Sequence, residues 1–176
     1  MMGSIKKPTV KMLLNPVHAI SMGFGSGLSP FAPGTAGTLA AIPLYFLCAH
    51  YINWTMSEPL NFIILIAVIF IPGSIFAHLT GKALGVTDHG AIVWDEVAGY
   101  FVTMFVVPYA AMSFLEVSIW AVAGFFVFRF FDIFKPWPAS WVDRNIKNGF
   151  GVMLDDVIAG IFSAVVLYFC INFFGG

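Results

Sequence analysis

Five long apolar runs divide this chain, and they limit its fold more than any other feature. A helix needs about 20 mostly apolar residues to cross the hydrocarbon core of a bilayer. The runs are continuous rather than alternating, which is typical of membrane helices and not of barrel strands. We therefore expect an all-α polytopic membrane bundle with about five embedded helices, at Thr38–Trp54, Leu60–Ala77, Val97–Met112, Val117–Phe134 and Val157–Phe174. The third run is short, and the sequence leaves open whether it crosses the bilayer fully.

Charged residues are scarce, and this scarcity identifies the medium around the protein. Of 176 residues, 10% are charged and 60% are hydrophobic, whereas a soluble domain has about 25% charged residues. So few charges cannot cover the surface of a water-soluble globule of this size. The formal net charge of −1 provides no basic field for nucleic acid, so we exclude that class of partner. The length predicts a single domain over residues 1–176.

The basic residues occur in every second segment that precedes or connects the apolar runs. Lys and Arg occur before the first run, between the second and third, and from the end of the fourth run to the start of the fifth. With five spans, all of these segments fall on one side of the membrane, which the positive-inside rule makes cytoplasmic. Twelve of the seventeen charged residues occur within Lys82–Glu96 and Arg129–Asp156. We therefore expect a polar site on the cytoplasmic membrane face, preceded by a glycine-rich loop, and a C-terminus outside.

Two segments with a shared pattern lie at the starts of the third and fifth runs, Val93–Gly99 and Met153–Gly160. Each holds two adjacent acids followed one turn later by small residues, which would let the two helices approach closely. Close approach would gather four carboxylates, and a hard divalent cation such as Mg²⁺ would relieve their repulsion. Alternatively, each pair simply complements the dipole of a helix N-terminus and faces water. The match between the two segments favours a metal site formed by Asp95, Glu96, Asp155 and Asp156.

A third charged motif lies at the end of the fourth run. Arg129 and Asp132 are three residues apart, so they share one face of a helix, and ionisable groups inside a span usually face the protein interior. Lys135 follows at the helix end, just before Pro136 and Pro138. The planar guanidinium of Arg129 would suit a phosphate group. The alternatives are a structural ion pair between Arg129 and Asp132, and a Lys135 that extends to the membrane interface.

A glycine-rich stretch precedes the first run, over Gly23–Gly37. Its composition permits tight turns and close approach of the backbone to a ligand, and the N–H groups at the start of the following helix could bind an anion. A flexible re-entrant loop would have the same composition. The stretch matches neither a Walker loop nor a dinucleotide-binding loop. The candidate substrate-binding residues here are Ser29, Gly34, Thr35 and Thr38.

Four segments carry these motifs and their surroundings: Gly23–Thr38, Gly85–Gly99, Arg129–Pro138 and Asp143–Gly160. Together they resemble the phosphatidylglycerophosphatase A family of bacterial membrane enzymes, in the order that the family has them. The resemblance implies Mg²⁺-dependent hydrolysis of phosphatidylglycerophosphate to phosphatidylglycerol and inorganic phosphate. It also implies a location in the bacterial inner membrane, with lipid tails in the bilayer and the phosphate at the cytoplasmic face.

The mechanistic hypothesis is direct, metal-assisted attack of water on the phosphate. The four paired acids would hold the metal, and Arg129 and Lys135 would stabilise charge on the phosphate oxygens. Asp132 would be a further metal ligand, a base that orients water, or the residue that orients Arg129. The alternative function is a small ion or metabolite transporter, which predicts polar groups at mid-bilayer and repeated spans. The interiors of the first, second and fifth runs carry no charge. The oligomeric state and the number of metal ions are not predicted.

Overall fold

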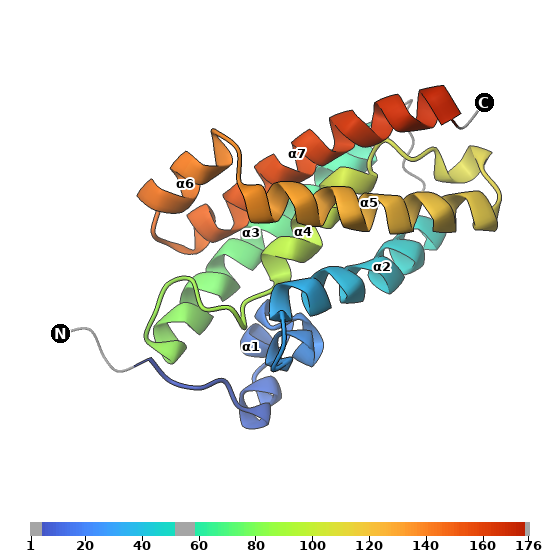
Figure 1. The fold of residues 1–176 in the computed structure, drawn as a ribbon. Helices are drawn as coiled ribbons and strands as arrows, with labels where there is room; N and C mark the ends of the chain where they lie inside the picture. The colour runs from blue at the N-terminus through green and yellow to red at the C-terminus, as the bar shows by residue number, and fades with distance from the viewer. Residues whose placement is uncertain (1–4, 52–58, 175–176) are drawn as a thin grey trace.

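The computed structural model describes residues 5–51 and 59–174, and all regular structure in these residues is helical (Figure 1). The α-helices are α1 (Pro16–Ser21), α2 (Pro33–Tyr51), α3 (Pro59–Leu84), α4 (Trp94–Met104), α5 (Phe114–Phe134), α6 (Ala139–Asn145) and α7 (Gly149–Phe174). Three short 3₁₀ helices accompany them, η1 (Val10–Leu14), η2 (Gly23–Leu28) and η3 (Tyr109–Ala111). The prediction of an all-α fold is confirmed for the described residues.

Three helical segments are long and apolar enough to cross a bilayer, at Leu60–Leu84, Phe114–Phe134 and Gly149–Phe174. The shortest of them has 21 residues, which corresponds to about 32 Å at the usual helical rise, against a hydrocarbon core of roughly 30 Å. Large apolar side chains such as Val68 and Phe126 are exposed on these helices, as expected where a helix contacts lipid. The described residues therefore contain three candidate spans, where the sequence predicts about five.

The third predicted span is shorter than expected. Its helix, α4, ends at Met104 after 11 residues, which is about half of the hydrocarbon thickness. The chain continues through turns and η3, because Pro108 has no backbone N–H and disfavours helix at the residue before it. Val107, in this irregular segment, is only 2% exposed. Such burial against protein is what allows non-helical backbone at membrane depth.

The first predicted span, Thr38–Trp54, corresponds to α2, which begins earlier than expected, at Pro33. The part of that prediction beyond Tyr51 lies outside the described residues. The glycine-rich stretch before it is not a simple loop, because it forms η2, a short link and the first turns of α2. Gly27 in η2 is constrained by a close neighbour, since a Cβ atom there would lie 2.1 Å from the carbonyl oxygen of Ala91.

The short helix α4 lies at the centre of the bundle, in contact with α2, α3, α5 and α7 (Figure 1). All of its residues over 95–104 are buried. Hydrogen bonds fix it to two neighbours: Trp94 Nε1 donates to the carbonyl of Ile69 in α3 (3.2 Å), and the Tyr100 hydroxyl donates to the carbonyl of Ala121 in α5 (2.9 Å). The N-terminus of α4 is thereby held at the end of the bundle where α7 begins and α5 ends.

Candidate active site

The two acid pairs predicted from the sequence occur at the same end of the bundle. Asp95 and Glu96 lie in the first turn of α4, and Asp155 and Asp156 lie in the second turn of α7. One carboxylate oxygen from each of Asp95, Glu96 and Asp156 lies within 4.8 Å of the other two, and all three residues are buried. Buried carboxylate oxygens at this spacing could hold a metal ion. Asp155 is also buried, but it does not belong to this trio.

Small residues bring α4 and α7 together, as the sequence predicts. A Cβ atom on Gly160 would lie 2.4 Å from the carbonyl oxygen of Gly99, and a Cβ atom on Gly99 would lie 2.6 Å from the carbonyl oxygen of Asp156. Real Cβ contacts are not this short, so the two backbones touch directly. Ala98 and Ala159 are also completely buried. The prediction that these residues allow close approach is confirmed.

Burial and repulsion raise the pKa values of the two acids on α4. For Asp95, burial is the largest cause of a pKa well above the ordinary value, followed by the charge of Glu96. Burial also raises the pKa of Glu96 to about 8, and the charge of Asp156 adds to the increase. The charge of Arg129 lowers the pKa of Glu96, but by less than burial and the charge of Asp156 raise it. The cluster therefore holds excess negative potential, which a bound cation would relieve.

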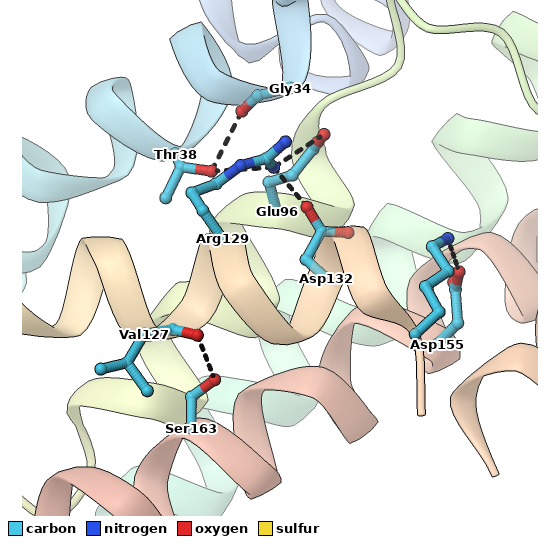
Figure 2. A network of polar contacts seen from close by, with 9 residues as sticks. Gly34, Thr38, Glu96, Val127, Arg129, Asp132, Asp155 and Ser163 are labelled. Atoms are coloured by element: carbon cyan, nitrogen blue, oxygen red, sulfur yellow. Dashed lines mark hydrogen bonds and ion pairs between the residues drawn. The ribbon is translucent and has the colours of Figure 1, made fainter. Parts of the chain in front are cut away.

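Arg129, near the end of α5, is held by groups from three helices (Figure 2). Its guanidinium forms an ion pair with Asp132 one turn later, and Nη1 lies 3.8 Å from Oε1 of Glu96 in α4. Nη1 also donates a hydrogen bond to Oγ1 of Thr38 in α2 (3.4 Å). Arg129 thus has a structural partner on its own helix and also lies beside the acid cluster, so the two interpretations of the sequence are compatible.

Lys135 follows the last residue of α5 and ends that helix with a left-handed backbone conformation (φ 42°). Its side chain forms an ion pair with Asp155 in α7, and Nζ lies 3.7 Å from Oδ1 of Asp143 in α6. Burial by itself would lower the pKa of Lys135, but the charge and hydrogen bond of Asp155 and the charge of Asp156 outweigh it and raise the pKa. The side chain is therefore a charged ammonium that points toward Asp155 in α7.

An open cavity of about 410 Å³ lies over these groups. Its charged lining consists of Asp88, Asp95, Glu96, Asp132, Asp155, Asp156, Arg129 and Lys135. The first turn of α2 closes one side of it. A cavity that combines carboxylates able to hold a metal with two cationic side chains suits a phosphate group, because phosphate oxygens bind both metal ions and cationic donors.

The four candidate residues of the glycine-rich stretch occupy different positions. Gly34 lines the cavity, and a Cβ atom on it would lie 2.3 Å from Oε1 of Glu96. Thr38 lies one turn further along α2, where its hydroxyl donates to the carbonyl of Gly34 (3.0 Å) and accepts from the guanidinium described above. Thr38 itself does not line the cavity, and neither do Ser29 and Thr35. The Ser29 hydroxyl instead donates to the carbonyl of Phe31 (2.7 Å).

Two polar residues of the site are absent from the sequence-based candidates. Asp88 lines the cavity, and Asp143 lies within 4 Å of both Lys135 (3.7 Å) and Lys147 (3.9 Å). Both acids belong to segments that carry the family motifs, Gly85–Gly99 and Asp143–Gly160. That location is the signal by which a sequence analysis could have selected them.

The sequence of this chain is similar to a known protein family. The family model described as phosphatidylglycerophosphatase A matches residues 19–171, a range that includes every residue lining the cavity. A protein from Escherichia coli (strain K12) named phosphatidylglycerophosphatase A is 42% identical over 165 residues, which cover 94% of this chain and 88% of that protein. A protein of the same name from Haemophilus influenzae is 40% identical over 156 residues, or 89% of each chain.

A third relative has a different name. It comes from Bacteroides thetaiotaomicron, carries the provisional name phosphatidylinositol-3-phosphatase, and is 37% identical over 153 residues, which cover 84% of this chain and 89% of that protein. No solved structure matches this chain. The family model spans most of the sequence and the identities extend over most of each relative, so this chain belongs to the phosphatidylglycerophosphatase A family.

Proposed function

We propose that this chain is a membrane phosphatase that hydrolyses phosphatidylglycerophosphate to phosphatidylglycerol and inorganic phosphate. The observation that carries the proposal is the cavity in which three buried acids lie beside Arg129, at the end of an apolar helical bundle. A lipid phosphomonoester would place its phosphate in this cavity while its acyl chains stayed in the bilayer. The names of the relatives from Escherichia coli and Haemophilus influenzae support the same substrate.

The donor set of the cavity fits Mg²⁺, which prefers carboxylate and water oxygens. Oδ1 of Asp95 and Oε2 of Glu96 are buried and have no hydrogen-bond partner among the described residues, so a cation would satisfy them. We assign Asp95, Glu96 and Asp156 as the residues that would hold the metal. Asp155 is a fourth candidate ligand, because its Oδ1 is likewise buried without such a partner. When bound, Mg²⁺ would neutralise charge on the phosphate oxygens and favour attack by water.

In this proposal Arg129 and Lys135 bind the oxygens of the phosphate. The planar guanidinium can donate two parallel hydrogen bonds, whereas the ammonium supplies a point charge. Asp132 orients Arg129 through their ion pair, and Thr38 supports the same guanidinium from α2. Gly34 contributes by having no side chain, since a Cβ atom there would occupy the space of the neighbouring carboxylate.

We further propose that the cavity faces the cytoplasm from a bacterial inner membrane. By sequence, the basic residues flank the segments that form the cavity, and residues 105–128, which lead away from it and back, contain neither Lys nor Arg. Trp137 and Trp141, which follow the cavity end of α5, are 77% and 52% exposed. Exposed tryptophans are typical of the membrane–water interface, so they support an interface at this end of the bundle.

Release of inorganic phosphate from phosphatidylglycerophosphate by the purified full-length protein, with and without Mg²⁺, tests the proposal. The wild type should require Mg²⁺, and Asp156→Asn should lose about 100-fold or more of this activity because it removes a metal ligand. Glu116→Gln is the matched control, since it makes the same chemical change at the far end of α5, where glutamine preserves the capping box. Wild-type turnover by folded Asp156→Asn would overturn the metal assignment, and no phosphate release by the wild type would overturn the substrate.

A further inference from the structure

A second, smaller hollow lies beside the cavity and shares Asp88 and Val152 with it. We call it the side hollow. It forms where the loop before α4 meets the end of α6 and the start of α7, and its other polar lining residues are Thr87, Asp143 and Lys147. Its volume of about 10 Å³ is close to that needed by a single water-sized group. The side hollow is therefore a small compartment adjoining the candidate phosphate site, with polar side chains beside an apolar lining of Ile146, Gly151 and Val152.

The charges of the side hollow do not suit a second phosphate. Asp88 and Asp143 contribute two carboxylates to its lining, against one ammonium from Lys147. That ammonium already lies 3.9 Å from Oδ1 of Asp143, and Nζ of Lys135 lies 3.7 Å from the same oxygen, so both nearby ammonium groups already face a carboxylate and are poorly placed to bind an anion. A neutral hydroxyl group suits the lining better, because it can donate to a carboxylate and accept from an ammonium or a threonine hydroxyl at the same time.

The chemistry of the proposed substrate supplies such a group. In phosphatidylglycerophosphate, a glycerol joins the terminal phosphate to the phosphodiester, and this glycerol keeps one free hydroxyl. With the terminal phosphate between Arg129 and the acid cluster, the glycerol lies next to the phosphate site, which Asp88 connects to the side hollow. We propose that the side hollow binds this free hydroxyl and thereby selects lipid phosphomonoesters whose bridging alcohol carries one. The proposal rests on the proposed function.

The expected selectivity follows from the exposure of the lining. A site that hydrogen-bonds a substrate hydroxyl rejects an analogue without it, because the polar groups of the site then stay unpaired. The side chains of Asp143 and Lys147 are 32% and 58% exposed, so water can partly replace the missing hydroxyl. We therefore expect a discrimination of about tenfold, below that of fully buried sites.

The test compares kcat/KM for phosphatidylglycerophosphate and for an analogue whose bridging alcohol is 1,3-propanediol, which lacks the free hydroxyl. The wild type should prefer the natural lipid by about tenfold. Thr87→Val and Lys147→Gln should reduce this preference toward one, by lowering kcat/KM for the natural lipid and leaving that for the analogue unchanged. Arg144→Gln is the matched control, because it removes a positive charge from α6 at a residue that does not line the side hollow.

The outcomes separate the proposal from simpler explanations. Equal kcat/KM values for the two lipids in the wild type would overturn it. So would variants that lower both lipids by the same factor, because a structural or long-range electrostatic role affects both substrates alike. Loss of the preference for the natural lipid in Arg144→Gln would also overturn the proposal, since the preference would then depend on surface charge rather than on the side hollow. If the wild type releases phosphate from neither lipid, the proposed function fails, and the proposal fails with it.

Discussion

One added methyl group at Gly34 should disable the cavity and leave the bundle folded. In Gly34→Ala, the new Cβ atom would lie 2.3 Å from Oε1 of Glu96 and 3.3 Å from both terminal nitrogens of Arg129. These contacts involve the ends of flexible side chains rather than backbone, so the side chains would move and the helices would stay in place. Alanine is also a better helix former than glycine, so α2 itself is not weakened.

The size of the effect follows from the displacement. The carboxylate of Glu96 would have to move by about 0.7 Å for the contact to reach 3.0 Å, below which real Cβ contacts essentially do not occur. A misplacement of about 1 Å in a catalytic site can cost about 100-fold in rate, so we expect kcat to fall roughly 10- to 100-fold. Because Glu96 is also a candidate metal ligand, the Mg²⁺ concentration for half-maximal activity should rise.

The assay is steady-state release of phosphate from phosphatidylglycerophosphate over a range of Mg²⁺ concentrations, with thermal unfolding of the same samples as a test of the fold. Gly90→Ala is the matched control. Gly90 lines the same cavity, but a Cβ atom there would contact only Cγ of Pro33, at 3.8 Å, so its activity should stay close to the wild type. An unchanged kcat and an unchanged Mg²⁺ requirement in Gly34→Ala would mean that the Glu96 carboxylate does not need the space left by Gly34.

Three further changes test other parts of the site. Arg129→Lys should lower kcat at least about tenfold because a planar fork becomes a point charge; unchanged steady-state kinetics would favour a purely structural pair with Asp132. Gly160→Ala should destabilise the fold by about 1–3 kcal/mol of overpacking, because its Cβ would lie 2.4 Å from the carbonyl oxygen of Gly99; a lowered midpoint of thermal unfolding checks this. Since the pKa of Glu96 is about 8, protons compete with the cation below that pH, so the Mg²⁺ requirement should rise as pH falls through 8. Mg²⁺ titrations on both sides of that pH measure it, and a constant requirement would contradict the assignment.

The acid cluster could be predicted because its determinants are local. In each pair of acids, small residues follow one helical turn later, so acids and small residues share a helix face. Gly99 and Gly160 then mark the two faces that can approach most closely, and the pairing of α4 with α7 follows from them. The ion pair of Arg129 with Asp132 is local in the same sense, since a spacing of three residues is enough to bring them together on any helix.

Contacts that depend on tertiary packing could not be read from spacing. Asp143 approaches Lys135 from a separate short helix, and no periodicity connects the two residues. Ser29 and Thr35 have the same polar character as Thr38. Of these three residues, Thr38 is the one whose hydroxyl accepts from Arg129, because the position of α2 against α5 decides which side chain is reached.

The residue at which α4 ends could not be predicted from the sequence for a different reason. Hydropathy measures preference for lipid, and the third run stays apolar as far as Met112, so hydropathy alone predicts a continuous span. The helix nevertheless ends at Met104. Whether an apolar segment is helical at membrane depth depends on the protein around it, and here the irregular segment packs against neighbouring helices, with the ring of Tyr109 6.4 Å from that of Tyr45 in α2.

The charge balance of the cavity links the cation to the substrate. Six carboxylates and two cationic side chains line it, which leaves four excess negative charges if all are ionised. A phosphomonoester adds about two more. Arg129 and Lys135 do not form a ready anion site, because each is already paired with a carboxylate. Burial and mutual repulsion raise the pKa values of Asp95 and Glu96, which favours protonation of these acids where no cation offsets their charge. We infer that a divalent cation would take the place of those protons without changing the total charge of the cavity, because it brings two positive charges for two protons. The ionised acids would then hold the cation, and phosphate would bind to the cation beside Arg129 and Lys135.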